Sequence, residues 1–200
     1  MSSVTDHYDL HLAPVYSWMA GGVENAVARG QKELTDIGIL DSRAGYAIDL
    51  GAGFGMHALP LAKSGCKVLA IDSSAYLLEE LKSHVGDAQV ETVQNDLLKF
   101  PSHLAGKPDV VLCMGDTLTH LPGISAVTAL ISSAKEHLSP GGRFVITFRD
   151  YTKALEGSNR FIPVKSDESR IFTCFLEYAR GKIRVYDILH DRIDGAWVMG

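Results

Sequence analysis

The feature that most constrains the fold is an apolar run that ends in a cluster of glycines and continues directly into a helical pattern. It reads AIDLGAGFGMHALPLA, with glycines at Gly51, Gly53 and Gly55. Glycine is needed where the backbone turns sharply or approaches a ligand closely, and a helix that begins there presents free amide groups. The run predicts a strand, a tight turn and a helix. Such a turn is typical of a ligand site, although glycine-rich turns without a ligand also occur.

The text after Ala44 repeats this alternation of strand and helix. Short β-branched runs are separated by stretches with apolar residues at helical spacing, which is the pattern of a parallel sheet covered by helices. The expected strands are residues 46–50, 67–71, 90–94, 109–114 and 143–149. We predict an α/β fold: a Rossmann-like doubly wound sheet, mostly parallel with a C-terminal antiparallel hairpin, and helices on both faces.

The chain is expected to form a single domain, residues 1–200, with three regions. Residues 1–40 form two helices broken at Gly21 and Gly22 and are interpreted as a lid, although their aromatic side chains fit core packing equally well. Residues 41–150 form the core. Residues 151–200 begin with a polar stretch and continue as IFTCFLEYA, GK and IRVYDILH, a hairpin with which the sheet ends antiparallel; GAWVMG is expected to begin one more strand.

Charge and hydropathy argue against nucleic-acid and membrane partners. Nineteen basic and 24 acidic residues give a net charge of −5, which argues against the extended basic surface that nucleic acid requires. No apolar run is long enough for a membrane helix, and the first residues do not form a secretory signal. We therefore predict no nucleic-acid partner, no membrane association, a cytoplasmic location and a monomer or homodimer.

Cysteine and histidine give no metal or disulfide pattern. Cys66, Cys113 and Cys174 are widely spaced in apolar text, which favours buried free thiols. His7 and His11 have a spacing that metal ligands can use, but no third ligand accompanies them. The prediction is that the protein holds no metal.

Three residues around the glycine turn discriminate between cofactor classes. A dinucleotide fingerprint beginning at Gly51 requires glycine where Met56 stands. Asp49, two residues before the turn, disfavours a pyrophosphate and favours an ammonium group. Asp72 ends the second strand, where a carboxylate can accept both ribose hydroxyls of an adenosine ligand. It could instead cap the next helix, but Ser73 and Ser74 can also do that. The site suits a cationic ligand without phosphate.

Asp49 to Gly55, Asp72, Asp96 and the segment GDTLTHL together resemble class I S-adenosylmethionine-dependent methyltransferases over roughly residues 40 to 150. The resemblance implies S-adenosyl-L-methionine as cofactor and S-adenosyl-L-homocysteine as product. It places Asp96 at the adenine amino group with the Leu97 backbone beside it, and Met114 at the methionine part. The expected cofactor-binding residues are Asp49, Gly51, Ala52, Gly53, Gly55, Asp72, Ser73, Asp96, Leu97 and Met114. Asp96 as a loop turn and Met114 as packing stay open as alternatives.

The segment CMGDTLTHLP differs from the Asn-Pro-Pro-Tyr type motif that resembles methylation of exocyclic amines in macromolecules. We therefore expect methyl transfer to a small molecule with a nitrogen or oxygen nucleophile. Asp116 and His120 are the candidate catalytic groups, expected to share a face at a helix start, and Tyr16 and Arg149 are candidate substrate contacts. Asp116 also fits a helix cap, His120 a structural role, and Arg149 a solvated basic face.

Two other functions stay open at this point. A protein that binds S-adenosylmethionine without catalysis would carry the same cofactor residues. A nicotinamide-dependent oxidoreductase would share the glycine turn, but Met56 and Asp49 oppose it.

Overall fold

The computed structural model describes residues 11–41 and 44–200. His7, which has a metal-ligand spacing with His11 in the sequence, lies outside the described residues. The chain divides into two compact units, one ending at Arg149 and the other beginning at Asp150. Each unit is described by itself.

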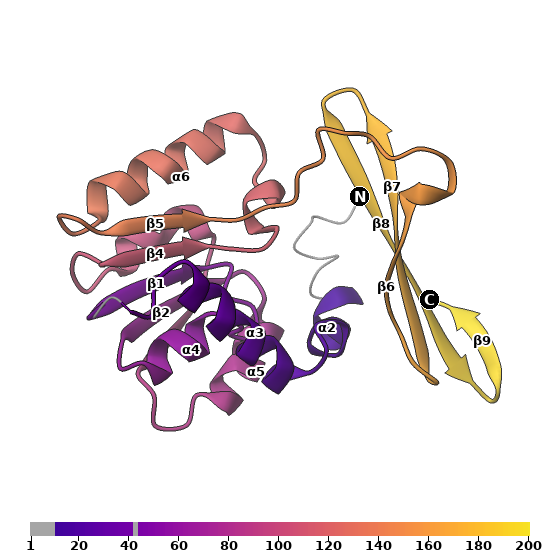
Figure 1. The fold of residues 1–200 in the computed structure, drawn as a ribbon, viewed down its shortest axis with the longest axis horizontal. Coiled ribbons are helices and arrows are strands. Elements are labelled where there is room, and N and C mark those ends of the chain that lie inside the picture. The colour runs from indigo at the N-terminus through magenta and orange to yellow at the C-terminus, as the bar shows by residue number, and fades with distance from the viewer. Residues whose placement is uncertain (1–10, 42–43) are drawn as a thin grey trace. The chain divides into compact units, whose positions relative to one another are not determined.

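The first unit contains a parallel sheet of five strands in the order β3-β2-β1-β4-β5, and several of these strands can be followed side by side in Figure 1. The strands are β1 (Tyr46–Leu50), β2 (Lys67–Asp72), β3 (Val90–Gln94), β4 (Val110–Cys113) and β5 (Arg143–Ile146). All four pairings are parallel. The strand order reverses between β1 and β4, and such a point opens a crevice at the carboxyl ends of the strands.

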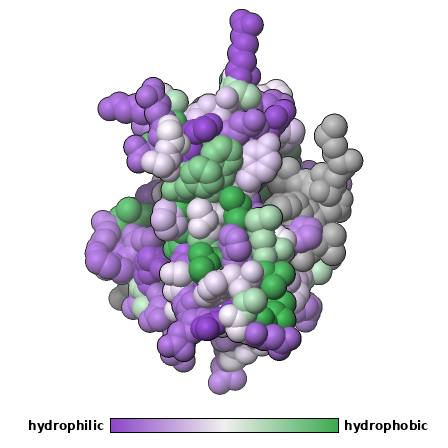
Figure 2. Space-filling view, turned by 90° about the vertical axis from the view of Figure 1, so that its right-hand side faces the viewer, coloured by the Kyte–Doolittle hydropathy of each residue, from purple (hydrophilic) through white to green (hydrophobic). Residues whose placement is uncertain are grey.

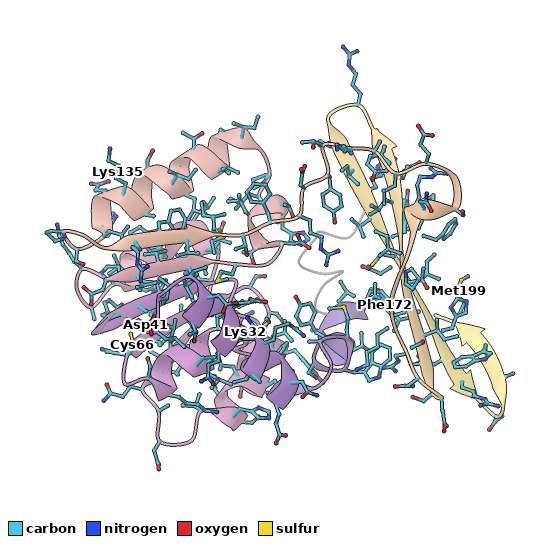
Figure 3. All side chains as sticks on the ribbon, viewed as in Figure 1. Lys32, Asp41, Cys66, Lys135, Phe172 and Met199 are labelled. Atoms are coloured by element: carbon cyan, nitrogen blue, oxygen red, sulfur yellow. The ribbon has the colours of Figure 1, made fainter. Side chains whose placement is uncertain are left out.

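Alternate residues of these strands are buried against different helices, because successive side chains of a strand point to opposite faces. Ala47, Val68 and Val110 share a core cluster with residues of α3 (Val23–Asp36), α4 (Ala58–Lys63) and α5 (Ala75–His84). Ile48 and Val111 belong to a second cluster, with residues of α6 (Ile124–His137) and of the 3₁₀ segment Leu97–His103. Side chains fill both interfaces (Figure 3). The predicted Rossmann-like fold with helices on both faces is confirmed.

The N-terminal segment forms two helices separated by glycines, as predicted: α2 (Ala13–Met19) and α3. Gly21 and Gly22 have φ angles of 93° and 91°, a region that a residue with a side chain rarely adopts. Ala13 of α2 and Ala26 of α3 are fully buried in one cluster with Phe54 of the glycine turn and Leu77 of α5.

The second unit is a separate antiparallel sheet, β6-β7-β8-β9. Its strands are β6 (Phe161–Ser166), β7 (Arg170–Ala179), β8 (Lys182–Ile193) and β9 (Ala196–Met199). The predicted hairpin is present as β7 and β8, and the additional strand as β9. The expectation that the hairpin ends the parallel sheet was wrong, since β5 pairs only with β4 and the hairpin with β6 and β9.

Strand β6 was not predicted, because Pro163 interrupts its apolar pattern. Proline cannot donate a ladder hydrogen bond and is tolerated at the edge of a sheet, which is where β6 lies. The pairing with β7 shifts register between Pro163 and Lys165. Apolar side chains reach the surface of this unit, including Phe161, Tyr186 and Trp197. Figure 2, which views the molecule from the side of this unit, shows apolar patches interspersed with polar ones.

Candidate functional site

The glycine turn follows β1 at the carboxyl edge of the parallel sheet. Gly51, Gly53 and Gly55 have φ angles of 73°, 52° and 96°. The backbone amides of Gly51 and Ala52 both donate to the carbonyl oxygen of Ile71, at 2.8 and 3.1 Å, so the turn is fixed to the end of β2. The three glycines are therefore required by the backbone conformation itself.

Two of these glycines are also required by close packing. A Cβ atom on Gly51 would lie 2.4 Å from the side chain of Thr117, and one on Gly55 would lie 2.3 Å from Leu81. Thr117 is held there by the hydrogen bond of its hydroxyl to the Met114 carbonyl, at 3.1 Å. Thr117 was not predicted as part of the site, because nothing in its local sequence shows that it packs against Gly51, 66 positions earlier.

Asp72 joins the glycine turn to the start of α5. Its Oδ2 accepts a hydrogen bond from the Gly53 amide at 2.7 Å, and its Oδ1 from the Ser74 amide at 2.8 Å. The cap of α5 is Ser74, whose hydroxyl accepts from the Leu77 amide. The Asp72 side chain thus lies at the glycine turn, at the end of β2.

Asp49 is the buried charge of the site, with an exposed fraction of 2%. Its Oδ2 has no hydrogen-bond partner in the part of the chain that the structure describes. Burial raises the pKa of this carboxyl group to about 6, an effect that His57 opposes and Asp72 reinforces. An unpartnered carboxylate oxygen is costly to bury and calls for a donor, which a bound ligand can supply.

Asp96 and Leu97 follow β3, whose last residue, Gln94, pairs with Asp72. The Asp96 side chain accepts a hydrogen bond from the Leu98 amide at 2.9 Å and caps the 3₁₀ segment. It is otherwise exposed. Asp96 therefore acts as a turn residue, the alternative that the sequence left open. Its Oδ2 takes no part in this hydrogen bond. Ser73 lies beside this loop, with its carbonyl oxygen accepting from the Gln94 side chain.

The segment after β4 carries a candidate catalytic residue, Asp116. Asp116 binds Arg149: its Oδ2 lies 2.9 Å from the Arg149 Nε, and its Oδ1 accepts from the Arg149 amide at 3.2 Å. The structure thus brings together one candidate catalytic group and one candidate substrate contact. The Asp116 side chain makes no cap hydrogen bond. Met114 is buried in the core with residues of α3, α4 and α5. This burial agrees with the alternative that Met114 serves in packing.

The segment Thr117–His120 is a 3₁₀ helix. The expectation that Asp116 and His120 share a face was wrong, because a 3₁₀ helix has three residues per turn and positions four apart are not aligned. His120 is exposed.

The N-terminal helices pack directly on the glycine turn. The ring of Tyr16 meets that of Phe54 edge to face, with the centroids 5.9 Å apart. Tyr16 is half-buried. A Cβ atom on Gly30 would lie 2.1 Å from the Met56 carbonyl oxygen, so the backbone of α3 passes in contact with the end of the turn.

This arrangement fits the amino acid and adenosine parts of S-adenosylmethionine. The unpartnered oxygen of Asp49 suits an ammonium group. The turn glycines allow close backbone approach, and Asp72 at the next strand end suits hydroxyl donors.

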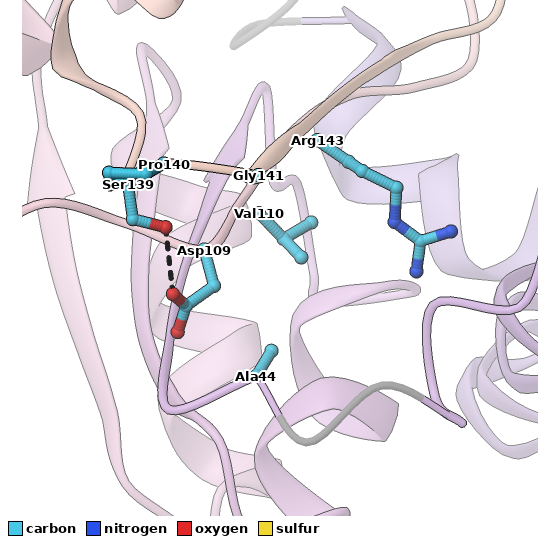
Figure 4. A pocket seen from close by; sticks show the side chains of 8 residues that line it. Ala44, Asp109, Val110, Ser139, Pro140, Gly141 and Arg143 are labelled. Atoms are coloured by element: carbon cyan, nitrogen blue, oxygen red, sulfur yellow. Dashed lines mark hydrogen bonds between the residues drawn. The ribbon is translucent and has the colours of Figure 1, made fainter.

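A small cavity of about 180 Å³ lies elsewhere, near the amino ends of β4 and β5 (Figure 4). Asp109 lines it and is engaged with Ser139 and with the Gly45 amide, hydrogen bonds that lower the pKa of this carboxyl group. Arg143, also at its edge, donates to the carbonyls of Ile37 and Gly38. These groups join strand ends and loops, so we assign the cavity a structural role.

Neither a metal cluster nor a membrane helix is found where the structure describes the chain. Within residues 11–41 and 44–200, no three His, Cys, Asp or Glu side chains are grouped as metal ligands. Over the same residues, no helix has the length and apolar character needed to cross a membrane. Cys66, Cys113 and Cys174 are free and buried, as predicted.

The proteins reported below that are similar to this chain are methyltransferases. Residues 47–142 match the model of a methyltransferase domain. The chain is 34% identical over 105 residues to a cypemycin N-terminal methyltransferase from Streptomyces, covering 52% of this chain and 40% of that protein. It is 31% identical over 113 residues to an Escherichia coli ubiquinone biosynthesis O-methyltransferase, covering 53% of this chain and 45% of that protein. The chain thus spans about half the length of the curated relatives it matches.

Solved structures show the same fold. An S-adenosylmethionine-dependent methyltransferase from Clostridium acetobutylicum aligns with a TM-score of 0.70 and 14% identity, covering 87% of this chain and 71% of that one. The CcbJ methyltransferase from Streptomyces caelestis aligns with a TM-score of 0.69 and 23% identity, covering 86% and 74%. Residues 47–142 are therefore similar to a methyltransferase domain, within a fold shared with solved S-adenosylmethionine-dependent methyltransferases.

Proposed function

We propose that this protein binds S-adenosylmethionine at the carboxyl edge of its parallel sheet and transfers the methyl group to a nitrogen or oxygen atom of a small molecule. The observation that carries the proposal is the buried Asp49 carboxylate beside a glycine turn, whose Oδ2 has no hydrogen-bond partner among the described residues. Both N- and O-methyltransferases occur among the matched relatives, which supports either acceptor atom.

Each part of the cofactor has a proposed partner in the chain. Asp49 accepts the ammonium group, and the turn residues Gly51 to Gly55 allow the backbone to contact the ligand. Asp72 accepts the ribose hydroxyls, with Ser73 beside it. Asp96 accepts from the adenine amino group, with Leu97 packing on the ring. Met114 contacts the methionine part from the end of β4.

The bound cofactor supplies a sulfonium methyl group that is already activated. The work of the protein is therefore to orient the acceptor in line with that group, to exclude water, and to take a proton where the acceptor carries one. Asp116 and His120 are the candidate proton acceptors, and Tyr16 and Arg149 the candidate acceptor contacts. Asp116 is the better oriented of the two, because Arg149 holds its carboxylate.

Thermal denaturation with S-adenosylhomocysteine tests the cofactor site. At a ligand concentration one hundred times Kd, the protein should gain about 2.7 kcal/mol and melt about 5 to 10 °C higher. Asp72→Asn should reduce this gain, while Asp36→Asn, an exposed change on α3, should leave it intact. Absence of any stabilisation at millimolar ligand would contradict the proposal.

Mass spectrometry of a panel of small amines, phenols and hydroxy acids tests transfer. The expected product gains one methyl group and appears together with S-adenosylhomocysteine. Asp116→Asn should lower kcat and leave S-adenosylhomocysteine affinity unchanged, since Asp116 is not among the proposed cofactor contacts. The fold should tolerate the change, because a partly exposed ion pair contributes under about 1 kcal/mol to stability. Binding without transfer to any member of the panel would instead favour a cofactor-binding module without catalysis.

A further inference from the structure

Beyond the residues expected to touch the cofactor, two side chains support the loop that carries Asp96. Asn95 lies between the end of β3 and Asp96, and its backbone amide donates to the Asp72 carbonyl oxygen at 3.0 Å. The Oδ1 of its side chain accepts from the Asp96 amide at 2.9 Å, and the Nδ2 lies 2.9 Å from the His103 Nε2. Asn95 therefore joins His103 to Asp96.

The position of His103 is fixed by the packing of its segment. His103 is the last residue of the 3₁₀ segment Leu97–His103. Phe100, in the middle of this segment, is fully buried in the core cluster that contains residues of α6. The ring of Phe100 also meets that of His137 edge to face, with the centroids 6.0 Å apart. Because Phe100 anchors the segment, the His103 ring supports the Asn95 side chain from a fixed position.

The hydrogen bonds of this loop have a defined direction. A backbone N–H only donates, so the atom of Asn95 that faces the Asp96 amide must be the carboxamide oxygen. The amino group of Asn95 then faces His103, and because an amino group of this kind only donates, the ring Nε2 is the acceptor. His103 thus selects one orientation of the Asn95 side chain, and Asn95 in turn holds the Asp96 amide.

The amide, the carbonyl oxygen and one carboxylate oxygen of Asp96 are engaged within its own loop. The amide donates to Asn95, the carbonyl oxygen accepts from the Lys99 amide at 2.9 Å, and Oδ1 accepts from the Leu98 amide at 2.9 Å. The Oδ2 atom takes no part in these hydrogen bonds. The position of this oxygen therefore depends on the backbone of Asp96, which the Asn95 side chain holds.

We propose that Asn95 and His103 are positioning residues that make the site specific for adenine: together they place the Asp96 Oδ2 to accept from the amino group of the base. The inference rests on the proposed function, because it takes the Asp96 loop as the adenine site. Hypoxanthine has a carbonyl oxygen where adenine has this amino group, so a fixed carboxylate oxygen favours adenine and repels hypoxanthine. Discrimination between the two bases measures how well this oxygen is placed.

Calorimetry with S-adenosylhomocysteine and S-inosylhomocysteine tests the proposal, since these ligands differ only in the base. The wild-type protein should bind the adenine ligand about 10- to 100-fold more tightly, as expected for one hydrogen bond to a charged group. His103→Phe keeps a planar ring and removes the acceptor, so the preference should fall about fivefold, the effect of one neutral hydrogen bond. The affinity for S-inosylhomocysteine should stay nearly unchanged. 5′-Methylthioadenosine, which lacks the amino acid part, should weaken by the same factor as S-adenosylhomocysteine, because it carries the same base.

Further variants distinguish positioning from a general effect on the loop. His103→Gln supplies an amide oxygen near the position of Nε2 and should restore most of the preference. Asn95→Ala removes both side-chain hydrogen bonds and should lower the preference at least as much as His103→Phe. The double variant should match Asn95→Ala alone, because His103 acts through Asn95. Ser102→Ala, the matched control, removes a hydrogen bond to the Lys99 carbonyl from the same segment and should leave the preference unchanged.

The outcomes separate the two proposals. Failure of the wild-type protein to bind S-adenosylhomocysteine would refute the proposed function. Normal binding with equal affinity for both bases in the wild-type protein, or with the same preference in the wild-type and Asn95→Ala proteins, would refute the positioning role alone. Equal weakening of both ligands in the variants would mean that the pair only stabilises the loop, and would also overturn the inference. Since Asn95 is only partly buried, Asn95→Ala keeps the test valid if His103→Phe does not fold.

Discussion

The buried Asp49 carboxylate should lower the free energy of unfolding at neutral pH, because burial disfavours its charged form. The pKa of this carboxyl group rises from 3.8 to about 6 on folding, mainly through burial. A raised pKa in the folded state stabilises the protein below the pKa of the unfolded chain, and that stability is lost as pH rises through the folded value. A difference of about 2 in pKa corresponds to about 3 kcal/mol.

The informative variant is Asp49→Asn, which removes the charge and keeps the shape. Relative to wild type, its free energy of unfolding should be unchanged near pH 4 apart from any packing effect. It should then increase between about pH 4 and 6 and stay up to about 3 kcal/mol higher above pH 6. Because packing effects of the amide do not depend on pH, the rise itself isolates the electrostatic cost.

Urea denaturation of both proteins at several pH values measures this difference, with Asp36→Asn as the exposed control. The same Asp49→Asn variant should bind S-adenosylhomocysteine about 10- to 100-fold more weakly, since a hydrogen bond to a charged group is worth about 1.5 to 3 kcal/mol. Its affinity for 5′-methylthioadenosine should not change. A stability difference that is flat across pH would refute the reasoning about burial, whatever the ligand measurements show.

Two further predictions concern the packing around the site. Gly51→Ala should destabilise the protein by about 2 to 4 kcal/mol in urea denaturation, because the new Cβ would meet Thr117 at 2.4 Å in a left-handed backbone. Gly53→Ala, where the nearest atom is 3.8 Å away, should cost only about 1 kcal/mol. Equal losses in the two variants would contradict the role of Thr117. Burial raises the pKa of the Cys66 and Cys113 thiols to about 11 and 12, so both should react with a disulfide reagent at pH 8 only after unfolding; rapid labelling of the native protein would show that these thiols are accessible.

Elements with a regular local pattern could be predicted from the sequence. The five parallel strands stand out because each is a short run rich in β-branched or apolar residues. Strand β5 ends at Ile146 rather than at residue 149, at the last residue of its ladder with β4. Strand β6 could not be predicted, because Pro163 breaks the pattern and the partner that makes it a strand is β7, some ten residues later. Whether the hairpin joins the first sheet depends on which edges pair, and no local pattern encodes this.

The candidate site divides in the same way, and the division has a physical cause. Asp49, Gly51 and Asp72 are recognisable because each lies at or next to the end of a strand, so their position along the chain fixes their position in space. Glu33 and His57 are 24 residues apart and come together only because Gly30 lets α3 touch the turn. A residue at a strand end can therefore be inferred from a motif, whereas a contact between residues far apart in the sequence depends on how the helices pack.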